Sequence, residues 1–213
     1  MTALIMFDFD GTVVDSLNIF IEAANRLAKD FSYSPFSLSQ IPSFRELSLR
    51  EMISQLGMPK WKFPFFIRRF RKELSGLMVD AQLVSGMEQA LYSIYQEHYQ
   101  LGIITSNSRQ NVELFLDLHE MRHLFEFIYG GQVLSGKAQV LKKLSKRNKP
   151  ISPSLVYVGD ETSDIRAAKS VGLPNIAVDW GFNNREVLSA SNPDILINSP
   201  SQLLAAITQL CEI

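Results

Sequence analysis

The chain has 213 residues, of which 46% are hydrophobic and 20% charged, as in a soluble globular protein with one large domain or a domain carrying an insertion. Its net charge of −1 excludes a general electrostatic attraction to nucleic acids or membranes. The single cysteine, Cys211, excludes disulfide frameworks and cysteine-based zinc sites. Residues 1–6 carry no charged stretch typical of a signal peptide, and no apolar run reaches the roughly 18 residues of a membrane span. We therefore expect a cytoplasmic protein.

The chain opens with a short apolar run, Leu4-Ile5-Met6, which predicts a buried strand that ends near Asp8 and Asp10. Helical spacing of apolar residues then predicts helices over 17–31, 44–56 and 64–78, with a Ser- and Pro-rich loop over 32–42. Residues 16–83 show no strand pattern. We interpret them as a small all-helical cap domain inserted after the first strand.

From residue 84 onward, strand and helix patterns alternate. Strands are predicted at 101–105, 127–129, 155–158, 176–178 and 195–197. Helices are predicted at 87–95, from 107 or 108 through 116, and at 137–147, 161–171 and 203–210. This alternation predicts an α/β fold, a Rossmann-like three-layer core with a parallel sheet, formed by residues 1–15 and 84–213.

Polar clusters follow three of the predicted strands, at the point where each strand ends. They are Asp8 with Asp10, Thr105-Ser106-Asn107, and Asp160 with Asp164, while Lys137 begins a later helix. The carboxyl ends of parallel strands meet at one edge of the sheet, so these groups are expected to converge. Two carboxylates 4 Å apart repel by about 4 kcal/mol at an effective dielectric constant near 20. A divalent cation removes this conflict, and oxygen ligands favour Mg²⁺.

A cation, a lysine, hydroxyls and backbone amides at helix starts together favour a phosphate group. In such a site Asp8 can act as a nucleophile on phosphorus, and Asp10 can hold a proton for the leaving oxygen. These roles would divide hydrolysis into the formation and the breakdown of an aspartyl phosphate.

Four motifs in order resemble the haloacid dehalogenase superfamily of phosphohydrolases, and in particular proteins of the phosphoglycolate phosphatase type. The first is Asp8-Phe-Asp10-Gly-Thr-Val-Val-Asp-Ser16, and the second is Leu101-Gly-Ile-Ile-Thr-Ser-Asn107. Gly136-Lys137 resembles the third, and Gly159-Asp-Glu-Thr-Ser-Asp-Ile165 resembles the fourth. The resemblance covers the core, about two-thirds of the chain, and it implies a magnesium-dependent phosphatase of small phosphate esters with a helical cap.

The resemblance also implies a role for each matching residue. Asp8 would be the nucleophile, and Asp10 the general acid and then base. Mg²⁺ would be held by Asp8, by the backbone carbonyl of Asp10 and by Asp160. The phosphoryl group would be bound by Asp10, Gly11, Thr105 and Lys137, with Ser106 as the alternative hydroxyl to Thr105. Asp164 would orient Lys137 or a metal-bound water.

Glu161 departs from the family pattern, in which a small residue is common at this position. Glu161 could contact the residues that bind the metal without binding the metal itself, or it could be an acid favoured by the dipole of the following helix. Two alternative functions also stay open: a phosphomutase on the same scaffold, and a relative that binds metal and phosphate without turnover.

The cap contains a basic and aromatic stretch, residues 60–72, which could suggest a membrane or nucleic-acid surface. We interpret it instead as a helix that packs its phenylalanines inward, so neither partner is expected. One cap arginine could reach the site and bind an anionic substrate tail; the candidates are Arg45, Arg50, Arg68, Arg69 and Arg71. We expect a monomer or a weak homodimer.

Overall fold

The computed structural model describes residues 3–47, 51–52, 54, 57–131, 136–147 and 155–212. Six parallel strands form its central sheet, in the order β5-β4-β1-β6-β7-β8. They are β1 (Leu4–Phe7), β4 (Gln100–Ile104), β5 (Phe125–Tyr129), β6 (Leu155–Gly159), β7 (Asn175–Val178) and β8 (Ile195–Ile197). The predicted α/β fold with a parallel sheet is confirmed.

Helices cover both faces of this sheet, because its central strand is apolar on both faces. Ile5 and Phe7 belong to one hydrophobic cluster, whereas Leu4 and Met6 belong to another. The first cluster includes residues of α5 (Met87–Gln96), α6 (Arg109–Leu118) and α10 (Leu203–Cys211). The second includes residues of α7 (Gly136–Arg147) and α8 (Thr162–Lys169). A period of two thus places alternate side chains of β1 in opposite layers.

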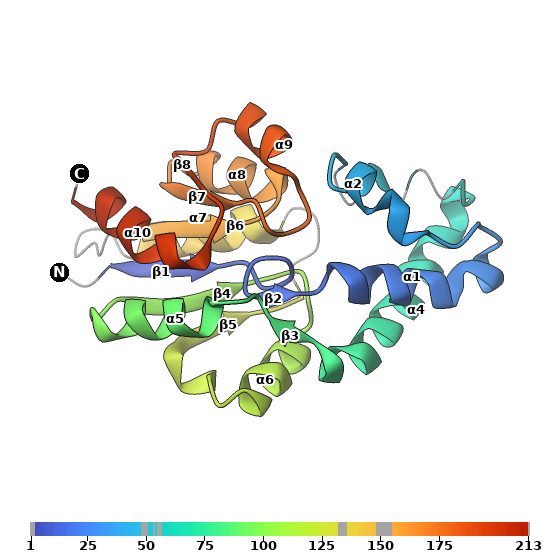
Figure 1. Cartoon of the computed structure of the whole chain (residues 1–213), viewed down its shortest axis with the longest axis horizontal. Coiled ribbons are helices and arrows are strands. Elements are labelled where there is room, and N and C mark those ends of the chain that lie inside the picture. The colour runs from blue at the N-terminus through green and yellow to red at the C-terminus, as the bar shows by residue number, and fades with distance from the viewer. Residues whose placement is uncertain are drawn as a thin grey trace.

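A helical unit lies beyond the carboxyl ends of the strands (Figure 1). Its long helices, α1 (Leu17–Phe31) and α4 (Phe63–Leu77), pack against each other around a hydrophobic cluster of their own that contains Leu27, Phe31 and Phe66. Phe66 packs inward as predicted, but Trp61 and Phe65 are exposed. Trp61 lies in the 3₁₀ turn Lys60–Lys62 before α4, and Phe65 lies in the first turn of α4.

Short elements account for the differences from the predicted pattern. Strands β2 (Val14–Asp15) and β3 (Gln82–Leu83) pair antiparallel, so the expectation that 16–83 contains no strand was wrong at its end. Two residues are too short to show an alternating pattern. The loop predicted over 32–42 contains a 3₁₀ turn at Leu38–Gln40 and the start of α2 (Ile41–Phe44). Pro42 fits there, since proline is tolerated in the first turn of a helix.

The helix predicted over 44–56 falls partly outside the described residues, and α2 ends where that helix was expected to begin. Helix α8 ends two residues earlier than predicted, and α9 (Arg185–Ala190) was not predicted. No helix in the described part of the chain is both long and apolar enough to cross a membrane.

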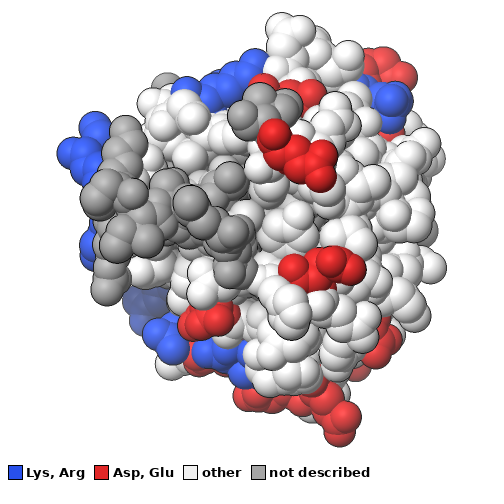
Figure 2. Space-filling view, turned by 90° about the vertical axis from the view of Figure 1, so that its left-hand side faces the viewer, with Lys and Arg blue, Asp and Glu red and all other residues white. Residues whose placement is uncertain are grey.

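The face at the opposite end of the sheet from the helical unit, where both chain ends lie, carries a mixed distribution of charge (Figures 1 and 2). Acidic side chains stand between uncharged residues, and basic ones lie toward the margins of this view. Charges of both signs therefore lie on the described part of this face.

Candidate active site

The polar clusters predicted to converge do meet at the carboxyl edge of the sheet. Asp8 follows β1, Thr105 follows β4 and Asp160 follows β6, and these are the three adjacent central strands. All three residues are buried, with at most 3% of their surface exposed. The Asp8 amide donates to the carbonyl of Val158 at 2.8 Å, so the hydrogen-bonded pairing of β1 with β6 continues to Asp8.

Lys137, at the start of α7, joins two of the acids. Its Nζ lies 2.6 Å from Oδ2 of Asp8 and 2.7 Å from Oδ1 of Asp164. The lysine side chain is 14% exposed, so these are largely desolvated ion pairs. Charge compensation for the acids therefore comes from a residue 129 positions beyond Asp8.

A candidate metal site lies among three buried acids. One carboxylate oxygen from each of Asp8, Asp160 and Asp164 lies within 4.8 Å of the others. Oδ1 of Asp8 is buried and has no hydrogen-bond partner among the described residues. A donor set of carboxylate oxygens with one oxygen left over fits a hard cation such as Mg²⁺. The Asp10 carboxylate is not a member of this group.

Asp160 is held from two sides. Its Oδ1 accepts a hydrogen bond from the Thr12 hydroxyl at 2.7 Å, and its Oδ2 accepts one from the Phe182 amide at 2.7 Å. Gly11 has φ +76°, and a Cβ there would lie 2.2 Å from Asp160 Oδ2. Only glycine combines this backbone conformation with so close an approach. The turn after β1 thus packs directly on the Asp160 carboxylate.

The Asp10 side chain is directed toward a chain of amides and a hydroxyl. Asn107 Nδ2 donates to both carboxylate oxygens of Asp10, at 3.0 and 3.2 Å. Asn111 Nδ2 donates to Asn107 Oδ1 at 2.9 Å, and the Ser75 hydroxyl donates to Asn111 Oδ1 at 2.7 Å. Ser75 belongs to α4, so this chain links Asp10 to the helical unit.

The two hydroxyls of the second motif have different surroundings. Thr105 is fully buried, and its Oγ1 accepts from the Asn107 amide at 3.0 Å. Ser106 is exposed and lines the cavity beside the site. Ser108, two residues later, caps α6 by accepting from the Asn111 amide.

Glu161 precedes α8 and forms part of its start. The Glu161 amide donates to Asp164 Oδ2 at 3.1 Å, and Ser163 donates to the Glu161 carboxylate at 3.3 Å. Burial and the charge of Asp164 raise the pKa of Glu161 to about 7. Tyr157, on β6, donates to Asp164 Oδ1 at 3.2 Å. Asp164 is therefore fixed by contacts to both of its oxygens.

Burial raises the pKa of the central carboxyl groups. The pKa of Asp8 is about 6, because burial outweighs the opposing charge of Lys137. The pKa of Asp10 is about 7, because burial and the charge of Asp8 both favour the protonated form. Burial and the charge of Asp8 also hold the pKa of Asp160 well above its usual range. Burial alone would lower the pKa of Lys137, but Asp164 and Asp8 keep it well above its usual range. The lysine thus stays charged.

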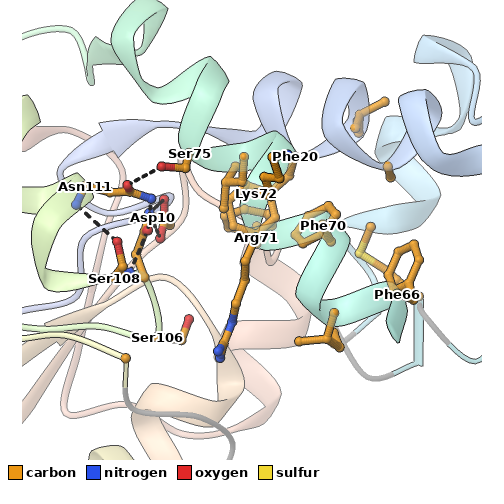
Figure 3. Close-up of a pocket in the computed structure, with 18 of the residues that line it drawn as sticks. Asp10, Phe20, Phe66, Phe70, Arg71, Lys72, Ser75, Ser106, Ser108 and Asn111 are labelled. Carbon is orange, nitrogen blue, oxygen red and sulfur yellow. Dashed lines mark hydrogen bonds between the residues drawn. The ribbon is translucent and has the colours of Figure 1, made fainter. Parts of the chain in front are cut away.

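A cavity of about 810 Å³ lies between this site and the helical unit (Figure 3). Asp10, Ser106 and Asn107 line its side nearest the sheet. Its opposite wall is largely apolar and comes from α1 and α4, with residues such as Phe20, Phe66 and Phe70. Asp10 is the acid that lines the cavity, so a small molecule there can reach the Asp10 carboxylate.

The candidate cap arginines are in different environments. Arg45 donates to the carbonyls of Gly181 and Asp179, so it attaches the segment after α2 to the core. Arg69 pairs with Asp30 at 3.0 Å on the surface. Arg71 lines the cavity. Arg50 lies outside the described residues.

Sequence reasoning assigned no site role to Tyr157, Asn111, Ser75 or Asn183. Asn183 accepts a hydrogen bond from the Thr162 amide and donates to the carbonyl of Leu47, thereby joining α8 to the segment after α2. Asparagine and serine are common caps and loop residues, so their types gave no signal. The segment Trp180-Gly181-Phe182 packs near the site, since Trp180 Nε1 donates to the Thr12 carbonyl.

Comparison with known proteins places the chain in a family. Residues 5–178 match the family model of haloacid dehalogenase-like hydrolases. A phosphoglycolate phosphatase of Synechococcus elongatus is 39% identical over 206 residues, which cover 97% of this chain and 97% of that protein. A phosphoglycolate phosphatase of Aliivibrio fischeri is 28% identical over 218 residues, covering 96% of each.

The fold is shared with solved structures. The crystal structure of a predicted phosphatase from Clostridium acetobutylicum matches with a TM-score of 0.84 at 20% identity, and the match covers 99% of this chain and 100% of that one. The family match spans most of the sequence, and the 39% identical relative is matched along nearly its whole length. The chain therefore belongs to the haloacid dehalogenase-like hydrolase family, as its motifs predicted.

Proposed function

We propose that this phosphatase is a magnesium-dependent phosphomonoester hydrolase that acts through an aspartyl phosphate on Asp8. One observation carries the proposal. Oδ2 of Asp8 is held by Lys137, whereas its buried Oδ1 has no partner among the described residues and lies beside two further acids. Asp8 thus has two differently placed carboxylate oxygens, so one can bind a cation while the other attacks phosphorus.

Asp8, the backbone carbonyl of Asp10 and Asp160 would hold Mg²⁺, and Asp164 lies close enough to contribute. When bound, the cation supplies charge neutralisation for the acids and for the phosphoryl oxygens. Lys137 adds a second positive charge, and Thr105 or Ser106 would orient the phosphoryl group through a hydroxyl. The Gly11 amide instead donates to the Val14 carbonyl and the Ser16 hydroxyl.

In the first step Asp8 forms a bond to phosphorus, and the ester bond to the leaving oxygen breaks. Asp10 gives its proton to that oxygen, so the alcohol leaves neutral. In the second step water attacks the phosphorus of the aspartyl phosphate, Asp10 takes back a proton, and Asp8 and inorganic phosphate are released. A pKa near 7 suits Asp10 for both proton transfers at neutral pH.

We further propose that residues 16–83 form a cap domain over a core of 1–15 and 84–213, with the β2–β3 pair as its linkers. The substrate would be a small phosphorylated metabolite of the phosphoglycolate type, a proposal supported by the 39% identity to the phosphoglycolate phosphatase of Synechococcus elongatus. The apolar cap wall would exclude water from the reacting groups.

Release of inorganic phosphate from 4-nitrophenyl phosphate and from phosphoglycolate, with and without Mg²⁺, tests the proposal. We expect turnover only with the metal, and a loss of at least about 10³-fold in Asp8→Asn. Retained turnover in Asp8→Asn would refute the nucleophile. Isomerised sugar phosphate without phosphate release would favour a phosphomutase, and Mg²⁺ binding without any turnover would favour a binding protein.

A further inference from the structure

The cap wall of the cavity between the helical unit and the site is largely apolar, and its polar side chains come from one stretch of α4, Arg71 to Ser75. Of the described residues that line it, only Arg71 and Lys72 are basic, and both belong to α4. In Figure 3 the Arg71 side chain extends from α4 into the cavity, and its guanidinium group ends on the side where Ser106 lies. Arg71 is exposed to solvent and also lines the cavity, so a ligand in the cavity can reach its guanidinium group.

Other described arginines of the helical unit are accounted for elsewhere. The guanidinium of Arg45 is hydrogen-bonded to two backbone carbonyls of the core, and that of Arg69 pairs with Asp30. Arg68 is exposed and does not line the cavity. Arg71 forms no hydrogen bond or ion pair with any residue that the structure describes. It is therefore available to an anion that enters the cavity.

The opposite side of the cavity indicates which anion this would be. Ser106, Ser108 and Asn111 line that side with uncharged polar groups, and Asp10 is the acid that marks the reacting end. A phosphoryl group bound at Asp8 and Lys137 would leave the rest of a small substrate in the cavity. A guanidinium group pairs with one carboxylate through two parallel hydrogen bonds, which a neutral tail cannot form.

We infer that Arg71 is the residue that selects substrates with a carboxylate tail, by pairing with that carboxylate while the phosphoryl group is at Asp8. This inference rests on the proposed phosphatase function and adds the specificity determinant to it. The enzyme would thus prefer short phosphorylated carboxylic acids over phosphate esters with neutral tails of the same size.

The test compares two substrates of nearly equal size, phosphoglycolate and 2-hydroxyethyl phosphate, in the presence of Mg²⁺. The measured quantity is the ratio of kcat/KM for the acid to kcat/KM for the neutral ester. Because it compares two reactions of one protein sample, it does not depend on the fraction of each variant that folds. We expect Arg71→Ala to lower this ratio about 10- to 100-fold, the range for losing a hydrogen-bonded charge pair.

Two variants sharpen the interpretation. Arg68→Ala removes a cation from the same helix outside the cavity, and it should leave the ratio at the wild-type value. Arg71→Lys keeps the charge but loses the bidentate geometry, and should give an intermediate ratio. An unchanged ratio in Arg71→Ala, or an equal fall in Arg68→Ala, would overturn the inference. Failure of the proposed function itself is a different result, namely no turnover of 4-nitrophenyl phosphate by the wild-type protein.

Discussion

Replacement of Lys137 by methionine removes the charge that compensates the acidic cluster and keeps a side chain of similar length. Lys137 lies 2.6 Å from Asp8 and 2.7 Å from Asp164, and both acids are almost fully buried. Removing one partner of a buried ion pair leaves an uncompensated charge and costs about 3–5 kcal/mol. For a protein of 213 residues, this loss corresponds to a fall in Tm of roughly 6–20 °C.

The assay is thermal unfolding at pH 7.5 in the presence of a chelator, so that no metal replaces the missing charge. Lys142→Met is the matched control, because Lys142 is exposed on the same helix α7. Lowering the pH to 5 should reduce the difference between Lys137→Met and wild type, since the acids then take up protons. If Lys137→Met were no less stable than Lys142→Met at pH 7.5, Lys137 would not be the compensating charge.

Three further predictions follow from the same geometry. The metal-free protein should lose stability as the pH rises from 5 to 8: folding raises the pKa of Asp10 from 3.8 to about 7, so the folded state holds a proton that the unfolded chain has lost. For Asp10 alone this linkage stabilises the folded protein by roughly 4 kcal/mol, in full below about pH 4, and the stabilisation is lost as the pH rises past 7. Urea unfolding as a function of pH measures it, and a free energy of unfolding that stays constant from pH 5 to 8 would show that Asp10 is ionised throughout. Gly11→Ala should lower both Tm and Mg²⁺ affinity, because the added Cβ would collide with Asp160. Gly86→Ala is the control: Gly86 has a similar φ of +84°, but a Cβ there meets no atom within 4 Å, so this variant should lower Tm alone. Equal Mg²⁺ affinity in the two variants would contradict the contact between Gly11 and Asp160. Asn107→Ala removes two hydrogen bonds that favour ionised Asp10, so the alkaline limb of the kcat/KM profile should move up by about one pH unit, and an unmoved limb would show that Asp10 is not the proton donor.

The parallel sheet and the convergence of its polar clusters could be predicted, because apolar runs such as Leu4–Met6 and residues 155–158 mark buried strands. The carboxyl ends of parallel strands share one edge, and this rule brings Asp8, Thr105 and Asp160 together without any knowledge of side-chain positions. The family resemblance and the comparisons agree with that interpretation.

What escaped prediction depends on tertiary contacts that leave no periodic signal. The β2–β3 pair is two residues long on each side, and Asn111 and Ser75 have types that usually indicate helix caps or loops. The cap arginines could not be ranked from sequence, because the direction of a long side chain is set by its neighbours. In the structure Arg45 contacts the core, whereas Arg71 lines the cavity.

The central claim, covalent catalysis by Asp8, is tested most directly by trapping the intermediate. Asp10→Asn should slow the attack of water on the aspartyl phosphate, while 4-nitrophenyl phosphate, whose leaving group needs no proton, still allows it to form. Acid quenching during turnover with Mg²⁺, followed by peptide mass spectrometry, should find phosphate on Asp8 in Asp10→Asn and none in the double variant with Asp8→Asn. Turnover without any phosphorylated Asp8, or with phosphate on another residue, would contradict the mechanism.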